Sequence, residues 1–228
     1  MVKKDLLARY EALGDERDFV AARTLYEQAV AQTTDARVLA DYGYLLESHG
    51  RHELRRAVEL YERAIDLDPG YDQAHYQLIS ARAGLQEPEL PVEIYERRVA
   101  DSPREVRERR FVATAYLRAH DYRHALTAAE AGLALVPNDA VLVALRGEAK
   151  AGLGDPEGAL ADWQCALQLD GGDISALYSS AFLLERLGRR TEAMQAWRSI
   201  IEWNERHGNT LNNEWPQQEL ERLRLPGH

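Results

Sequence analysis

The feature that most constrains this chain is a period of 34 residues. Small, aromatic and proline residues recur at this step along the 228 residues. The recurring positions are Ala125, Ala159 and Ala193, then Pro69, Pro103 and Pro137, then Tyr61 and Tyr95, and Trp163 and Trp197. Self-similarity with a period of about 20 to 50 residues is the signature of a repeat array. Each unit of such an array packs only on its neighbours, so the length does not give a number of globular domains.

A turn between two helices is clearest at Gly154-Asp155-Pro156. The glycine can take the left-handed conformation that ends a helix, and the aspartate can accept N–H groups of the next one. Proline fits at the first helical position, where its missing N–H costs nothing. The same break recurs at Gly188-Arg189-Arg190-Thr191-Glu192, at His120-Asp121-Tyr122 and at Gly50-Arg51-His52. Each break therefore separates two amphipathic helices of about 12 to 15 residues.

Small residues mark where the two helices of each pair cross, because antiparallel helices approach closely only there. Those in first helices are Gly43, Ala113, Gly147 and Ala181, and those in second helices are Ala57, Ala125, Ala159 and Ala193. Large residues fill the space beside the crossings, namely Tyr26, Tyr61, Tyr95, Trp163 and Trp197. Ala29, Ala64 and Ala166 lie three residues, or about one helical turn, after Tyr26, Tyr61 and Trp163.

These residues resemble the pattern of the tetratricopeptide repeat (TPR) family. The second repeat supplies Leu39, Tyr42-Gly43, Leu46, Gly50, Ala57, Tyr61, Ala64 and Pro69. The fourth supplies Ala113, Tyr116, Asp121-Tyr122, Ala125 and Pro137. The resemblance implies an all-α fold: a right-handed α-solenoid of about six helix-turn-helix units plus a C-terminal capping helix.

The predicted array covers residues 1–205, and residues 206–228 form a capping helix and tail. The repeats lie at approximately 3–34, 35–69, 70–103, 104–137, 138–171 and 172–205. The last helix begins near Pro216, and Trp215, Leu220 and Leu223 are expected to cover the sixth repeat, since arrays need a cap with a polar outer face. The alternative for this helix is binding a partner.

Several positions depart from the family pattern. The second repeat has one extra residue near Glu53-Leu54-Arg55-Arg56, and Thr34, Gly171 and Glu205 replace the closing proline. In the third repeat Pro91 and Arg98 stand where the family has small residues. We expect its second helix to be short and to start near Pro91, after a loop at residues 86–90. This repeat is either a tolerated irregularity or a joint where the array flexes or a partner docks.

Charge and composition exclude several classes of function. The net charge of -10 argues against generic binding to nucleic acid or anionic membranes. One cysteine, Cys165, excludes an internal disulfide and suits a reducing compartment. Asp5, Arg9 and Glu11 interrupt any signal-peptide core, and no stretch approaches the roughly 18 apolar residues of a membrane span. We therefore expect a cytoplasmic protein.

The family resemblance implies that the first helices line a concave groove that holds peptides, helices or folded partners. The strongest candidates for partner contacts are Tyr44, Tyr76, Gln77, Arg107, Arg110, Thr114, Arg118, Tyr178 and Phe182. Residues 104–137 carry six arginines against four acidic residues, whereas residues 138–171 carry two basic against six acidic residues. Because the arginine fork suits carboxylates, Arg107, Arg110 and Arg118 are candidates to bind an acidic segment or a C-terminal carboxylate, near the aromatic anchors Tyr44 and Tyr76. The alternative is that these arginines pair with acidic residues of the array.

Other constellations are weak. Some family members grip an acidic tail with lysine and asparagine, but the corresponding positions here are Tyr44 or Ser80 and Gln77 or Phe111. His120 and His124, like His49 and His52, flank a turn rather than share a helix face, so no metal site is expected. Cys165 has no neighbouring base to activate it. Phosphate-binding, nucleophile-elbow and metalloprotease motifs are absent, so neither a cofactor nor an enzyme is predicted.

The sequence thus predicts a non-enzymatic scaffold or adaptor that binds a protein or peptide in its groove. The alternative is a structural array that associates with itself. A closed pocket with convergent, perturbed titratable groups would instead indicate an enzyme or a small-ligand protein.

Overall fold

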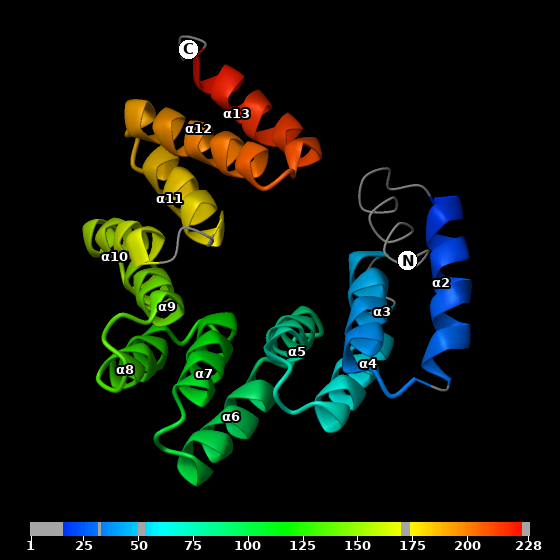
Figure 1. Cartoon of the computed structure of the whole chain (residues 1–228). Helices are drawn as coiled ribbons and strands as arrows, with labels where there is room; N and C mark the ends of the chain where they lie inside the picture. The colour runs from blue at the N-terminus through cyan, green and yellow to red at the C-terminus, as the bar shows by residue number, and fades with distance from the viewer. Residues whose placement is uncertain (1–15, 32, 50–52, 170–173, 225–228) are drawn as a thin grey trace. The chain divides into compact units, whose positions relative to one another are not determined.

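A computed structural model describes residues 16–31, 33–49, 53–169 and 174–224, and every regular element within them is helical (Figure 1). The all-α class is therefore confirmed for these residues. The helices are α2 (Glu16–Val30), α3 (Ala36–His49), α4 (Leu54–Leu67), α5 (Asp72–Gly84), α6 (Glu89–Asp101), α7 (Val106–Arg118), α8 (Tyr122–Leu133), α9 (Ala140–Gly152), α10 (Pro156–Leu169), α11 (Ile174–Arg186), α12 (Arg190–Arg206), the 3-10 helix η2 (Thr210–Asn213) and α13 (Glu214–Arg224).

The helices fall in pairs at the predicted period. Repeats two to six correspond to α3–α4, α5–α6, α7–α8, α9–α10 and α11–α12, and consecutive helices such as α3 and α4 or α9 and α10 pack together. The second helix of the first repeat is α2. The part of the first repeat that precedes α2, the turn at residues 50–52 and Gly171 lie outside the described residues.

The chain divides into two compact units. One consists of Met1–Pro103 with Thr114–Ala119, and the other of Arg104–Ala113 with His120–His228. Among the described residues of the first unit, a hydrophobic core runs from Phe19 on α2 to Ala81 on α5. In the second unit, the last helical pair has a core of Ala181, Trp197, Ile200 and Leu220. Each unit therefore has apolar contacts of its own.

The predicted crossing residues are buried, and the two glycines among them are in very close contact with aromatic rings. A Cβ atom on Gly43 would lie 2.5 Å from Cε1 of Tyr61, and one on Gly147 would lie 2.9 Å from the indole of Trp163. Ala57, Ala113, Ala125, Ala159, Ala181 and Ala193 are all fully buried. Packing against the neighbouring helix therefore explains these recurring residues.

The first helix of each pair from repeat three onward ends at a residue in the left-handed conformation. These residues are Gln86, His120, Gly154 and Gly188, with φ of 65°, 58°, 84° and 72°, and they are spaced by 34 residues. At Gly154 the following N–H, that of Asp155, bonds the carbonyl of Lys150 at 2.9 Å, which satisfies a carbonyl at the helix end. The predicted stop at Gly154 is thereby confirmed.

The predicted caps at the start of the second helices are also present. The carboxylate of Asp155 accepts from the N–H of Gly158 at 2.9 Å, and Pro156 is the first residue of α10. Asp121 plays the same part for α8, accepting from the N–H of His124 at 3.2 Å.

The expected start of the second helix of repeat three is wrong by two residues. Helix α6 begins at Glu89 and is 13 residues long, the same length as α5, so it is not short. Pro91 lies in its first turn, where no intrahelical bond needs the missing N–H, and its side chain is buried at the crossing position. Arg98 lies over the ring of Tyr95 with its guanidinium carbon 5.8 Å from the ring centre. The proline is therefore compatible with a full-length helix.

Helix α13 packs on α12 at the end of the second unit. Leu220 is buried in the core with Trp197 and Ile200, and Leu223 packs against the same core. The last residues, 225–228, lie outside the described part of the chain. Within that part, no helix combines the length and the apolar composition that a membrane span requires.

Candidate functional site

Four aromatic rings from three helices gather where α13 packs on the last helical pair of the second unit. Tyr178 and Phe182 belong to α11, Trp197 to α12 and Trp215 to α13. The rings of Tyr178 and Trp215 are stacked at 5.6 Å with an interplanar angle of 11°, and Phe182 lies 5.7 Å from Trp215. All three contact Trp197 at 5.4 to 5.9 Å.

Trp197 is the buried member of this aromatic cluster, and the other three rings pack on it. It is fully buried, and its Nε1–H donates to Oε1 of Glu185 on α11 at 2.6 Å. Phe182 and Trp215 pack on it yet remain 49% and 44% exposed. Because a buried ring holds them in place, the exposed rings offer a rigid apolar surface. Rigid aromatic side chains often supply much of the binding energy at protein interfaces.

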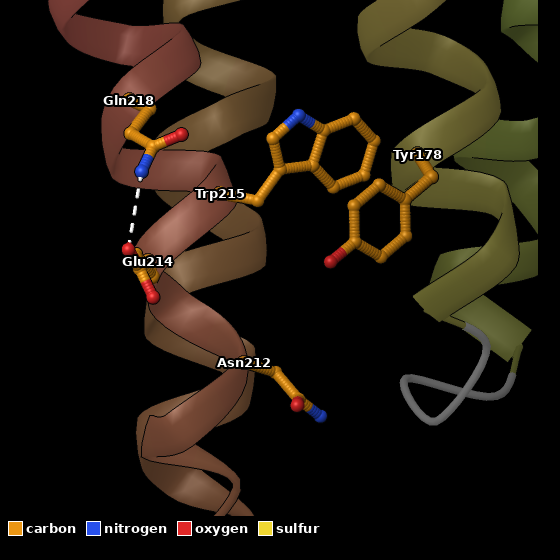
Figure 2. Close-up of a pocket in the computed structure, with 5 residues that line it drawn as sticks. All are labelled: Tyr178, Asn212, Glu214, Trp215 and Gln218. Carbon is orange, nitrogen blue, oxygen red and sulfur yellow. Dashed lines mark hydrogen bonds between the residues drawn. The ribbon is translucent and has the colours of Figure 1, made fainter. Parts of the chain in front are cut away.

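A pocket of about 480 Å³ opens between α11 and α13 beside this cluster, and we call it the α11–α13 pocket (Figure 2). It is lined by Tyr178, Asn212, Glu214, Trp215 and Gln218. Figure 2 shows the rings of Tyr178, from α11, and Trp215, from α13, side by side between the two helices. The amide of Gln218 donates to the carboxylate of Glu214 at 3.3 Å. The lining is therefore aromatic and polar, with one acidic group.

A second pocket of about 320 Å³, the α9–α11 pocket, is formed by residues of α9, α10 and α11. It is lined by Glu148, Ala151, Trp163, Ser179, Phe182, Leu183 and Arg186. Its walls are mainly apolar, and Phe182 connects it to the aromatic cluster. Both pockets include residues of α11, so the second unit has two neighbouring hollows that can receive side chains.

Ion pairs fix the helices around these pockets. Arg222 of α13 pairs with Glu185 of α11 and with Glu219, while Arg146 and Lys150 of α9 both pair with the buried Asp162 of α10. Burial by itself raises the pKa of Asp162, but the hydrogen bonds from Arg146 and Lys150 outweigh it and the net shift is downward. Burial also raises the pKa of the Tyr178 hydroxyl, so this group is neutral at physiological pH.

The α7 arginines differ in their surroundings. Arg110 binds the carboxylate of Asp139 through Nε at 3.0 Å and Nη2 at 2.5 Å, and Asp139 also caps α9 by accepting from the N–H of Leu142. Both residues belong to the second unit, and the pair joins the fourth repeat to the fifth. For Arg110 this agrees with the alternative that the arginines pair with acidic residues of the array. Arg107 is half-buried with its Nη2 3.8 Å from Glu108, and Arg118 is exposed. Thr114 is buried, so its side chain is not on the surface.

The remaining predicted contact residues lie in the first unit. Tyr44 on α3 is exposed, whereas Tyr76 and Gln77 on α5 are half-buried. Oε1 of Gln77 is buried and has no hydrogen-bond partner in the described residues. Tyr178 and Phe182 are the predicted contact residues that the structure brings together in the aromatic cluster.

The weaker candidates have ordinary structural surroundings. His120 Nδ1 lies 3.0 Å from the hydroxyl of Tyr122, and His124 Nδ1 lies 2.7 Å from Oδ2 of Asp121. His52 lies outside the described residues, and in those that are described no three metal-ligating side chains cluster. Cys165 is exposed. Phe111 is fully buried, so it cannot act at the clamp position that it occupies in the family pattern.

Sequence reasoning missed two parts of this site. Trp215 was expected to cover the sixth repeat, but its ring also forms an exposed wall of the α11–α13 pocket. The buried carboxylates of Asp139 and Asp162 were counted only as negative charge. Asp139 stands directly before α9, and Asp162 stands directly before the buried Trp163. These positions are the signals in the sequence that point to the two carboxylates.

The comparisons with known proteins agree with this architecture. No family model and no curated protein matches the chain. Among solved structures, TTC0263, a thermophilic TPR protein of Thermus thermophilus, is 21% identical over 84% of this chain and 100% of its own, with a TM-score of 0.64. MamA is 18% identical over 69% of this chain and 92% of its own, with a TM-score of 0.49. YrrB, described as a TPR protein with an unusual peptide-binding site, is 20% identical over 78% and 91%, with a TM-score of 0.47.

The likeness to the Thermus protein shows that this chain has the tetratricopeptide-repeat fold. The fold inferred from the 34-residue period is thereby confirmed. At this level of identity the likeness concerns the fold, and the function follows from the site.

Proposed function

We propose that this protein is a non-enzymatic scaffold or adaptor that binds a segment of another protein across α11. The observation that carries the proposal is the aromatic cluster, in which Phe182 and Trp215 stay about half exposed beside two pockets. Apolar ring surface that stays in water is unfavourable, and its presence next to pockets is typical of a contact surface.

A displayed library of random twelve-residue peptides tests this proposal. The intact protein is expected to select peptides, and Phe182→Ser is expected to lose most of their binding because the ring forms part of the apolar wall. Leu187→Ser is the control, since Leu187 is also exposed but lines neither pocket. Failure to select any peptide, or equal binding by both variants, would contradict the proposal.

Self-association is the competing function, and light scattering after size exclusion separates the two. A binding module for other proteins is expected to stay monomeric at high concentration. A concentration-dependent rise in mass that Phe182→Ser abolishes would instead assign the aromatic cluster to contacts between copies of this chain.

An acidic segment bound by α7 is a second candidate, favoured by the exposure of Arg118. Reversing Arg110 is a poor test, because a glutamate there would face the buried Asp139. Arg118→Glu is better, with the exposed Arg123 of α8 changed to Glu as the control. Fluorescence anisotropy with a labelled decaglutamate peptide is expected to show weaker binding for the first variant, and no binding by the intact protein would contradict this candidate.

A further inference from the structure

The α11–α13 pocket has the electrostatic character of a site for a cation. Among its five lining residues one is a carboxylate and none is basic. The stacked rings of Tyr178 and Trp215 also line this pocket, and the face of an aromatic ring carries the negative part of its quadrupole. A cation near an aromatic face and a carboxylate is favoured by both, and an indole is the best of the aromatic partners.

Glu214 is the carboxylate that is available to such a cation. Its neighbours Glu185 and Glu219 share one basic partner, Arg222, and each also accepts an indole N–H, from Trp197 and Trp215 respectively. Glu214 accepts one weak hydrogen bond, from Gln218, and forms no ion pair with a basic side chain of the described residues. Among these three carboxylates, Glu214 is therefore the one that lines the pocket and has no basic partner in the described residues.

The α9–α11 pocket is of the opposite kind. Ala151, Trp163, Phe182 and Leu183 supply apolar walls, and the charges at its sides, Glu148 and Arg186, have opposite signs. Burying an aliphatic or aromatic side chain there removes apolar surface from water on both partners, with a gain of about 25 cal/mol per Å².

One ligand can reach both pockets, because neighbouring residues of α11 line them: Tyr178 lines the α11–α13 pocket, and Ser179 and Phe182 line the α9–α11 pocket. Phe182 also packs on Trp215, which lines the α11–α13 pocket. A helix is about 10 Å across, a width that an extended chain crosses in about three residues. A segment of about that length therefore has the reach to place one side chain in each pocket.

We propose that the partner is a peptide segment with a lysine or arginine about three residues from a large apolar residue. The basic side chain enters the α11–α13 pocket against Glu214 and Trp215, and the apolar one enters the α9–α11 pocket against Phe182. This inference rests on the proposed function and specifies the chemistry of the partner. It also separates this surface from the acidic segment expected at the α7 arginines.

Glu214→Gln tests the inference, and Glu221→Gln is its matched control. Both side chains are exposed on α13, but Glu221 does not line the pocket. Peptides selected by the intact protein are expected to be enriched in a basic residue about three positions from an apolar one. Binding of one such peptide, measured by fluorescence anisotropy, should weaken about three- to tenfold in Glu214→Gln and stay within about twofold in Glu221→Gln.

Two further readouts identify the contact. Replacing the basic residue of the peptide with glutamine should cause the same loss, and the two losses should not add, because they remove one interaction. The dependence of affinity on salt should also be weaker for Glu214→Gln than for the intact protein.

The outcomes distinguish this inference from the function on which it rests. Selected peptides that are acidic, or equal binding by Glu214→Gln and Glu221→Gln while Phe182→Ser abolishes it, would overturn the basic partner and leave the binding function standing. Selection of no peptide by the intact protein would overturn both.

Discussion

At the scale of single residues, the carboxylate of Asp162 shows how this array uses a buried charge. Its oxygens lie 2.6 Å from Nη2 of Arg146 and 2.7 Å from Nζ of Lys150, and only 7% of the side chain is exposed. Two basic side chains of α9 are thereby bound to one point on α10. The pair of helices is held by these contacts as well as by the buried Trp163.

We expect Asp162→Asn to lower the free energy of unfolding by about 1 to 3 kcal/mol at pH 7, because two basic groups lose a charged partner. The pKa of Asp162 lies below its ordinary value of 3.8 in the folded protein. Its contribution is therefore complete above that value and is lost as the pH falls through the folded pKa. Urea denaturation at pH 7 and below pH 3.8 measures this, with Asp66→Asn, on an exposed part of α4, as the control. An equal effect at both pH values would contradict the ion-pair explanation.

Gly147→Ala tests the helix crossing itself. Alanine would add about 1 kcal/mol of helix propensity, but its Cβ would lie 2.9 Å from the buried indole of Trp163 and 3.2 Å from the carbonyl of Ala159. We expect a net loss of about 1 to 2 kcal/mol in the free energy of unfolding. Gly84→Ala meets only the end of the Leu54 side chain at 3.3 Å and should stay within about 0.5 kcal/mol of the unchanged protein. If Gly147→Ala raised the free energy of unfolding, helices α9 and α10 would be able to move apart without losing stability.

Residues that recur with the period could be predicted from the sequence, whereas charged residues inside the array could not. Gly147 and Trp163 have equivalents in other repeats, so their common packing role can be inferred by alignment of the chain with itself. The residues one period before and after Asp162 are Ala128 and Ala196, so its carboxylate has no equivalent in the neighbouring repeats. Its burial depends on Arg146 and Lys150, which only the folded arrangement brings to it.

At the scale of the helix, a left-handed residue after the first helices of repeats three to six marks where the pair turns. Gln86 and His120 take φ of 65° and 58° without being glycine. A positive φ costs a residue with a side chain about 1 to 2 kcal/mol. Glycine avoids this strain, but its greater freedom in the unfolded chain lowers the free energy of unfolding and offsets part of the gain. The sequence identified Gly154 and Gly188 because glycine is the usual signal, and it missed Gln86, which placed the start of α6 two residues late.

We expect Gln86→Gly to raise the free energy of unfolding by about 0.5 kcal/mol and Gly154→Ala to lower it by about 1 kcal/mol. A Cβ on Gly154 would meet no atom within 4 Å, so backbone strain is the sole cost of that alanine. Thermal unfolding followed by circular dichroism compares both variants with the unchanged protein. If Gln86→Gly destabilised the protein, the side chain of Gln86 would have to make a contact that offsets its strain.

At the scale of the whole molecule, the candidate site depends on how a repeat array ends. The period predicted the helix that carries Tyr178 and Phe182, and the residues that follow the last repeat predicted a final helix that covers the sixth repeat. It could not predict that Trp215 would remain about half exposed, stacked on Tyr178, packed against Trp197 and lining a pocket. That outcome depends on the angle at which α13 meets α11, and no repeated residue encodes it because the terminal helix has no equivalent elsewhere in the chain.

The separate cores predict that damage to one end of the array stays local. Leu220 packs on Ala181, Trp197 and Ile200, whereas Val58 of α4 belongs to the core that runs from Phe19 to Ala81. Since the stability of a repeat array is close to a sum of units and of contacts between neighbours, we expect Leu220→Ala to lower the protection of amides in α11–α13 and to leave α3–α4 unchanged.

Val58→Ala is the matched variant and should give the reverse pattern, because both changes remove buried apolar groups at a cost of roughly 1 to 4 kcal/mol. Native-state hydrogen exchange resolves the two regions in one experiment. An equal loss of protection in both regions from either variant would mean that the chain unfolds as a single unit. In that case the aromatic cluster would share the stability of the whole protein, whereas the array model makes it depend on α11, α12 and α13 alone.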